Sequence, residues 1–209
     1  MDRQIREISS MSRKEEIERI IEERKIKVLL HFTQLENLPS IIEGGLKPKD
    51  DLNEDAKCND KLRLDNHTDT ISLSIQHPND PMFFKYRQEN TKADWCILAI
   101  PAKVLLEKDA LFCHRNAASA EVSCLSEEVL RKASSLEKMF EEIPNFSSRA
   151  EQCLKSSDPT DVQAEILLKG TILPEEIIGI VFTSRQAKKD HNDLIGDRII
   201  KIHGENKTY

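Results

Sequence analysis

The chain carries His31-Phe32-Thr33-Gln34-Leu35-Glu36-Asn37-Leu38 near its start and Gln163-Ala164-Glu165-Ile166-Leu167-Leu168 near its end, and these two stretches decide the fold. Each stretch places one polar, chemically capable side chain, His31 or Glu165, in an apolar run. A buried strand seldom holds histidine or glutamate unless a partner or a ligand satisfies the side chain. We therefore predict that two strands, distant in the sequence, line one cleft with His31 and Glu165.

The composition indicates a soluble protein with one main domain. The chain has 209 residues, of which 38% are hydrophobic and 33% charged, so it is long enough to bury a real core. No apolar run approaches the roughly 18 residues of a membrane span, and the N-terminus lacks the apolar core of a signal peptide. The five cysteines include no CxxC pair, and nothing nearby completes a metal site around Cys113-His114. We expect a cytoplasmic protein with reduced thiols and no bound metal.

The net charge of −6 weighs against a protein whose whole surface grips nucleic acid, because phosphate contacts need lysine and arginine. It leaves room for a local basic track. Lys85 and Arg87 form one candidate, and Arg115 belongs to another. The simpler interpretation of any one such cluster is solvated surface charge.

The pattern of strands and helices favours the α+β class, because strands mix with short helices without regular alternation. A helical stripe of isoleucines runs through residues 2–25, where Ser12 and Glu15 form a capping-box pattern. We expect this stretch, residues 1–25, to be an N-terminal helical extension of a domain over residues 26–209. Residues 126–155 are predicted to be helical, with an interruption at Pro144 and a buried face made by Val129, Leu130, Leu136, Met139 and Phe140. Strands are predicted at residues 27–32, 70–75, 95–100, 162–168, 177–183 and 198–203, with short helices at 35–43, 82–88 and 184–191.

An ordered set of short motifs resembles the DarT family of NAD-dependent ADP-ribosyltransferases, which act on bases of single-stranded DNA. The set covers roughly residues 28–183 and consists of His31-Phe32-Thr33 with Asn37-Leu38, Gly45-Leu46, Ile71-Ser72-Leu73-Ser74, Pro81-Met82, Asn116-Ala117-Ala118 and Gln163-Ala164-Glu165. The stretch from Ser74 to Arg87 is more similar to the guanine-modifying branch than to the thymine-modifying one.

The resemblance implies an ADP-ribosyltransferase fold, with two small mixed sheets around an NAD cleft and helices at the periphery. NAD is then the co-substrate, without a metal. The resemblance implies a catalytic role for Glu165 and for Arg63, the best match to the family's catalytic arginine. It further implies NAD contacts from His31, Thr33, Asn37, Arg63, Ser72 and Met82, and nucleic-acid contacts from Lys85, Arg87, Arg115 and Asn116.

The chemistry is consistent with these residue types. Cleavage of the nicotinamide–ribose bond develops positive charge on the sugar, which a carboxylate at Glu165 stabilises electrostatically. The resemblance predicts a toxin that marks single-stranded DNA and is paired with a macrodomain antitoxin of the DarG type, with guanine the expected base. The alternatives are transfer to RNA or protein, or a catalytically silent module that binds NAD or nucleic acid. Without the resemblance, a satisfied core histidine and a solvated glutamate are the simpler interpretations of His31 and Glu165.

Overall fold

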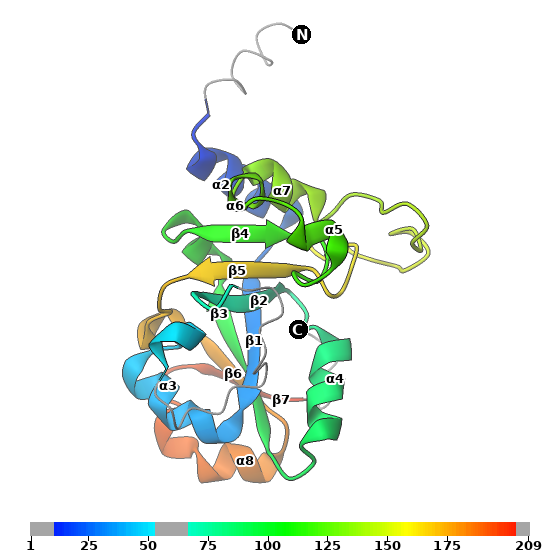
Figure 1. Cartoon of the computed structure of the whole chain (residues 1–209). Helices are drawn as coiled ribbons and strands as arrows, with labels where there is room; N and C mark the ends of the chain where they lie inside the picture. Colours follow the sequence, from blue (N-terminus) through cyan, green and yellow to red (C-terminus); the bar gives the residue numbers. More distant parts are fainter. Residues whose placement is uncertain (1–10, 53–66, 204–209) are drawn as a thin grey trace, which may run out of the picture.

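The computed structural model describes residues 11–52 and 67–203, and within them seven strands form a sheet flanked by short helices (Figure 1). The predicted α+β class is confirmed. The strands are β1 (Val28–Gln34), β2 (Thr70–Ile75), β3 (Trp95–Pro101), β4 (Ala110–Cys113), β5 (Glu165–Lys169), β6 (Gly179–Phe182) and β7 (Ile199–Ile202). The helices are α2 (Arg13–Arg24), α3 (Leu38–Gly44), α4 (Asp80–Glu89), α5 (Ala120–Ser123), α6 (Glu127–Leu130), α7 (Ala133–Lys138) and α8 (Arg185–Asp190), with 3-10 turns at Leu35–Asn37, Lys49–Asp51, Ala102–Leu106, Pro174–Glu176 and Asn192–Leu194.

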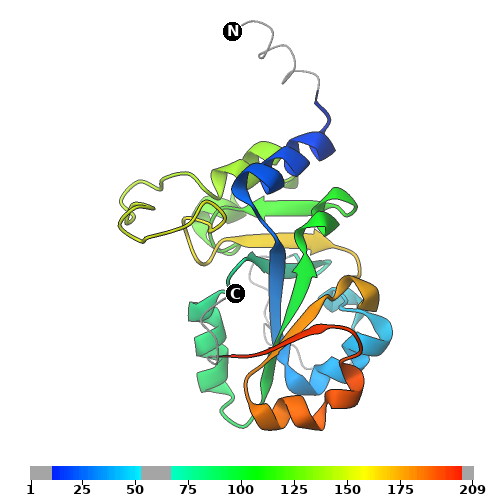
Figure 2. The same cartoon turned by 180° about the vertical axis from the view of Figure 1, so that it is seen from behind.

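The strands form one hydrogen-bonded sheet in the order β4-β5-β2-β1-β3-β6-β7, so the expected division into two small sheets is not confirmed. Strand β2 makes the connection by changing partner along its length. Its first four residues pair with β5, whereas Ser74 and Ile75 pair with Leu30 and Leu29 of β1. Both views show β4 and β5 running across the direction of β1 (Figures 1 and 2). Within the described residues, neighbouring strands are antiparallel, except that β6 and β7 run parallel.

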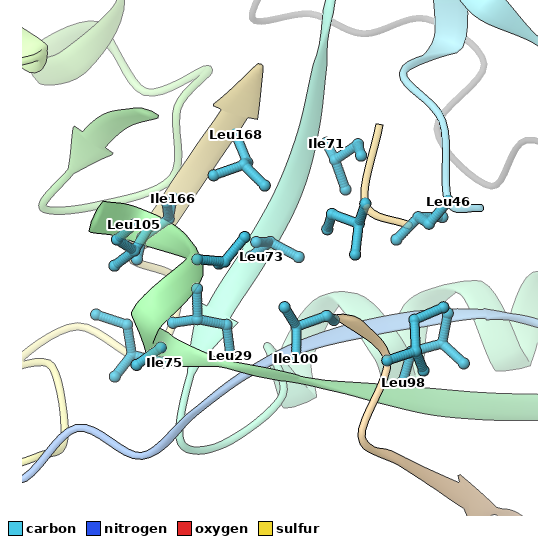
Figure 3. Close-up of a cluster of buried hydrophobic side chains, with 14 of the residues drawn as sticks. Leu29, Leu46, Ile71, Leu73, Ile75, Leu98, Ile100, Leu105, Ile166 and Leu168 are labelled. Carbon is cyan, nitrogen blue, oxygen red and sulfur yellow. The ribbon is translucent and has the colours of Figure 1, made fainter. Parts of the chain in front are cut away.

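Alternation along β2 and β5 gives this part of the sheet two faces: one packs into the main core, and the other holds Ser72 and Glu165 beside Leu167, which packs into a second hydrophobic cluster. Ile71, Leu73, Ile166 and Leu168 point into the main core, together with residues of β1 and β3 (Figure 3). Because successive side chains of a strand point to opposite faces, Ser72 and Glu165 lie on the other side of the sheet. The register pairs Leu73 with Ile166 and Ser72 with Leu167, which brings the two polar side chains close together.

Helix α2 is packed into the same core as the sheet. The predicted capping box is confirmed, since the Ser12 hydroxyl accepts from the backbone N–H of Glu15 and the Glu15 carboxylate accepts from the backbone N–H of Ser12. Ile17 and Ile20 are 0% and 1% exposed within the main hydrophobic cluster. The start of the predicted stretch, residues 2–10, lies outside the described residues. The boundary between an extension and a domain at residues 25 and 26 stays a prediction.

The helical stretch predicted over residues 126–155, with an interruption at Pro144, ends at Lys138, so the prediction is wrong beyond that residue. Turns replace the helix, with positive φ at Asn145 directly after Pro144 and again at Cys153. The Arg149 guanidinium organises this irregular segment by donating to the backbone oxygens of Lys155 and Asp158. Of the expected buried face, Leu130, Leu136, Met139 and Phe140 are buried, whereas Val129 is 39% exposed.

Two further elements differ in length from their predictions. Strand β5 begins at Glu165 rather than at residue 162, because a turn occupies Val162 and Gln163. Helix α4 is longer than predicted and begins at Asp80. Asn79 caps its N-terminus, because the Asn79 side chain accepts a hydrogen bond from the backbone N–H of Met82. None of the helices in the described part of the chain is long and apolar enough to cross a membrane.

Gly45 is predicted to be indispensable for the packing of α3 against the chain after β5. Its backbone has φ 85° and ψ 164°, and an added Cβ would lie 2.6 Å from the carbonyl oxygen of Ile172, next to the Leu46–Ile172 bridge. Gly45→Ala is expected to lower the free energy of unfolding by roughly 2–5 kcal/mol, through backbone strain and steric overlap. The matched control is Gly170→Ala, with φ 79° and open space around the Cβ, which is expected to cost only about 1–2 kcal/mol. Equal losses in urea denaturation would contradict the steric explanation.

Candidate active site

Ser72 joins His31 and Glu165. The Nδ1 atom of His31 lies 2.9 Å from the carbonyl oxygen of Ser72, and the Ser72 hydroxyl donates to Oε2 of Glu165 at 2.7 Å. The three residues come from β1, β2 and β5, which are consecutive in the sheet. The structure therefore brings together the two side chains that the sequence singled out, across a single intervening strand.

Asn116 provides the second hydrogen bond to the carboxylate. Its Nδ2 donates to Oε1 of Glu165 at 2.7 Å, and its Oδ1 accepts from the backbone N–H of Ala118 at 3.0 Å. Glu165 is 7% exposed, so each of its two oxygens has a donor at a site largely removed from water. A buried charge needs such donors, because the hydrogen bonds replace the hydration that burial removes. The arrangement fixes the orientation of the Glu165 carboxylate.

Met82 lies beside this pair, at the start of α4. Its sulfur is 3.4 Å from Nδ2 of Asn116. The position of Met82 follows from the helix cap, since the side chain of the buried Asn79 accepts from the Met82 backbone N–H at 3.2 Å. Met82, Asn116 and Glu165 thus come together from a helix, a loop and a strand.

Thr33 and Asn37 contact each other at the end of β1. Nδ2 of Asn37 donates to the hydroxyl of Thr33 at 3.0 Å, and Thr33 is 4% exposed. Thr33 follows His31 by two residues on the same strand, so both side chains face the same side of the sheet. The predicted grouping of these residues beside His31 is compatible with this geometry. Arg63, the predicted catalytic arginine, lies outside the described residues.

The basic residues predicted to contact nucleic acid have different surroundings. Arg115 donates to Asp161 and to Glu121, both at 3.1 Å, and these hydrogen bonds, that to Glu121 first, raise the pKa of Arg115. The guanidinium of Arg87 lies over the ring of Phe83 at 5.3 Å, whereas Lys85 is largely exposed on α4 and lies 3.9 Å from Glu89. Arg115 is next to the site in sequence, while Lys85 and Arg87 lie farther along α4 from Met82.

Asp161 is a site neighbour that sequence reasoning missed. It is 3% exposed, and its Oδ1 accepts from the backbone N–H of Gln163 at 2.8 Å. An aspartate is a recognisable local signal of a turn, since its side chain often accepts a hydrogen bond from the backbone N–H of the residue two positions later in the sequence. The signal of a turn after Asp161 was therefore present in the sequence, but a continuous strand was predicted there instead.

Among the described residues, no group of three or more His, Cys, Asp or Glu side chains is arranged to hold a metal ion. The polar groups gathered around Ser72 are instead a carboxylate, an amide, an imidazole and a hydroxyl. Such a set suits the hydroxyls of a sugar and a positive charge that develops near them.

A family model described as "ssDNA thymidine ADP-ribosyltransferase, DarT" matches residues 30–209. The chain belongs to the DarT family. The predicted family and the predicted enzyme class, an NAD-dependent ADP-ribosyltransferase, are confirmed. No curated relative matches this chain.

Solved DarT structures have the same fold at low sequence identity. Thermus sp. 2.9 DarT in complex with NAD+ is 14% identical, with a TM-score of 0.55 over 84% of this chain and 94% of that one. The same protein in complex with ADP-ribosylated ssDNA is 14% identical, with a TM-score of 0.57 over 86% and 95%. Thermosipho africanus DarTG in complex with ADP-ribose is 17% identical, with a TM-score of 0.57 over 84% of this chain. This chain spans only 49% of that chain's length.

His114, which precedes the site residues Arg115 and Asn116 of this DarT-family chain, is predicted to make stability depend on pH. Burial, followed by the charge of Lys138, lowers the pKa of His114 below its ordinary value of 6.5. The unfolded chain therefore binds more protons than the folded one as pH falls through 6.5, so stability decreases in that direction until the folded-state pKa is passed. In urea denaturation, the wild type is expected to lose more stability than His114→Gln between about pH 7.5 and pH 5. Identical losses in both proteins would refute this assignment.

Proposed function

We propose that this chain transfers ADP-ribose from NAD to a base of single-stranded DNA and releases nicotinamide. The observation that carries the proposal is the buried Glu165 carboxylate, which Ser72 and Asn116 hold beside the contact between His31 and Ser72. Family membership supports the reaction class, and the complexes of Thermus sp. 2.9 DarT with NAD+ and with ADP-ribosylated ssDNA support the substrates.

Glu165 acts electrostatically in this proposal. NAD supplies the ADP-ribosyl group and a neutral leaving group, nicotinamide. The Glu165 carboxylate accepts a hydrogen bond from a ribose hydroxyl. It also stabilises the positive charge that develops on the sugar as the bond to nicotinamide lengthens. Because Ser72 and Asn116 already orient the carboxylate, little reorganisation is needed when that charge appears. Glu165 also takes the proton that the attacking base nitrogen loses as the new bond to the sugar forms.

Other predicted residues bind and orient the substrates. His31, with Thr33 and Asn37 beside it, holds the adenosine part of NAD, and Arg63 pairs with its phosphates, since a guanidinium offers forked donors to phosphate oxygens. Met82 packs against the nicotinamide side and the target base. Lys85 and Arg87, on the exposed side of α4, contact the DNA backbone near the site. The target base has to leave its stack, which is inexpensive in a single strand.

We propose guanine as the modified base. The support is the similarity of the segment Met82-Phe83-Phe84-Lys85-Tyr86-Arg87 to the guanine-modifying branch. The matching family model is described by thymidine, so these two bases are the alternatives that an experiment must distinguish. In the cell we place the enzyme in the cytoplasm, as a toxin restrained by a macrodomain antitoxin that removes the mark. The DarTG chain of Thermosipho africanus, about twice as long as this one, supports such a partner.

The direct test is to incubate the protein with NAD and single-stranded oligonucleotides, each of which contains one guanine or one thymine in an otherwise identical context. Mass spectrometry is expected to detect the gain of one ADP-ribose on the guanine oligonucleotide. Modification of thymine alone would overturn the base assignment. Modification of RNA or protein but not of DNA would replace the target and keep the chemistry.

Glu165→Gln is expected to reduce the transfer rate by roughly 10²- to 10³-fold, because the amide keeps the shape but cannot stabilise positive charge. NAD should still raise the melting temperature of this variant, since a ligand that binds the native state stabilises it. A catalytically silent binding module would show no transfer in either protein. A wild-type rate retained in Glu165→Gln would exclude the proposed role of the carboxylate.

Ser72→Ala tests the hydroxyl that orients Glu165. Losing the donor to Oε2 of the carboxylate is expected to slow transfer by about 10-fold, or about 1.4 kcal/mol in the barrier. Ser74→Ala is the matched control, because Ser74 lies two residues along the same strand and is the more buried of the two serines, at 7% exposure. Initial rates at saturating NAD give the comparison. Equal effects of the two substitutions would show that general packing of β2, and not the hydrogen bond to Glu165, is responsible.

A further inference from the structure

A salt bridge joins Arg115 to Asp161, and these residues shortly precede Asn116 and Glu165 in the sequence, which are themselves hydrogen-bonded. Nε of Arg115 is 3.1 Å from Oδ2 of Asp161, whose side chain is only 4% exposed. A buried carboxylate is costly unless it is paired and hydrogen-bonded, so this contact ties its two segments together firmly.

Asp161 also fixes the turn that leads into β5. Its second carboxylate oxygen accepts from the backbone N–H of Gln163 at 2.8 Å, and its backbone oxygen accepts from the N–H of Ala164 at 2.9 Å. Glu165 is the next residue and the first of the strand. The position of Glu165 along the sheet therefore depends on how Asp161 is held.

The contacts close into a ring. Arg115 precedes Asn116, the Asn116 amide donates to Glu165, the turn connects Glu165 back to Asp161, and Asp161 pairs with Arg115. The ring joins the loop after β4 to the turn before β5 at two points. If the backbone of either segment rotated, both the hydrogen bond between Asn116 and Glu165 and the salt bridge between Arg115 and Asp161 would be strained.

The surroundings of Arg115 leave little of its guanidinium for another anion. One edge pairs with Asp161 and another with Glu121, while the ring of Phe146 lies 5.8 Å from the guanidinium carbon. A phosphate that reached the remaining nitrogen, Nη2, would lie close to two carboxylates already paired with the same guanidinium, and their repulsion offsets much of the electrostatic gain.

We propose that Arg115 and Asp161 are positioning residues, which hold Asn116 and Glu165 in the orientation needed for transfer, and that Arg115 acts through Asp161 rather than by contacting DNA. This replaces the nucleic-acid role predicted for Arg115. The kinetic part of the proposal rests on the proposed function, whereas the structural part does not.

Two conservative variants and one matched control test the proposal. Arg115→Lys keeps the charge but loses the forked donors, and Asp161→Asn keeps the acceptor for Gln163 but loses the charge. The control is Glu121→Gln, which changes only the other partner of Arg115. The Glu121 side chain is 59% exposed. Thermal melting of each full-length protein establishes that it is folded.

The first measurement is hydrogen–deuterium exchange of the peptide that covers residues 162–166. Exchange there is expected to accelerate about 10-fold in Arg115→Lys and Asp161→Asn, with the rest of the sheet unchanged, because the turn opens locally. Glu121→Gln should exchange like the wild type. Unchanged exchange in both conservative variants would overturn the proposal, whether or not the protein modifies DNA.

The second measurement is the kinetics of transfer to the oligonucleotide that the wild type modifies. Arg115→Lys and Asp161→Asn are expected to lower kcat by roughly 10- to 100-fold, with KM for DNA within about two-fold of wild type, since small misplacements of a catalytic group are costly. A rise in KM for DNA in Arg115→Lys, and wild-type kinetics in Asp161→Asn, would instead show a phosphate contact made by the forked donors of Arg115. If the wild type modifies no DNA, the proposed function fails, and the exchange measurement alone decides the role of the salt bridge.

Discussion

The hydrogen bond from the Ser72 hydroxyl to the Glu165 carboxylate is the contact on which the arrangement of the site depends. It can form only because β2 lies between β1 and β5 and changes partner along its length. The segment of β2 that pairs with β5 presents Ser72 to Glu165, and the Ser72 carbonyl meets His31 on the other side. One residue thus links the two halves of the sheet and the two ends of the site. A carboxylate at the start of a buried strand would otherwise destabilise the sheet that contains it.

The separation of faces along β2 and β5 explains how one short strand pair serves both the core and the site. Isoleucines and leucines at alternate positions fill the main cluster, and the intervening positions hold Ser72, Glu165 and Leu167, the last of which packs into a second hydrophobic cluster. A shift of one residue in the pairing would exchange the two sets and place a carboxylate among the aliphatic side chains of the main cluster. The cost of that exchange keeps the register fixed. Chemistry and stability therefore select the same register.

The acidic character of the chain is compatible with a DNA substrate, because few cations are needed near a single target base. The exposed basic side chains on α4 include Lys85 and Arg87, which follow Met82 within the same helix. Other cations are used within the protein: Arg149 binds backbone oxygens of its own segment, and Arg115 pairs with Asp161. In the proposed reaction, single-strand binding would then depend more on recognition of the base in the site than on a large electrostatic surface.

The sequence by itself determined the strands at β1, β2 and β3, the short helix after β1 and the capping box of α2, and it singled out His31 and Glu165, which Ser72 links in the structure. These features are local: alternation, caps and glycines act within a few residues, so their signals survive without knowledge of the fold. The helix predicted after α7 does not form, because the chain turns at Asn145 with positive φ and Arg149 bonds to backbone oxygens six and nine residues further on. Only the tertiary structure decided that β2 joins both halves into one sheet and that Asn116 and Ser72 share the Glu165 carboxylate. Those contacts link residues 49 and 93 positions apart, and no local preference of the chain specifies which distant groups will meet.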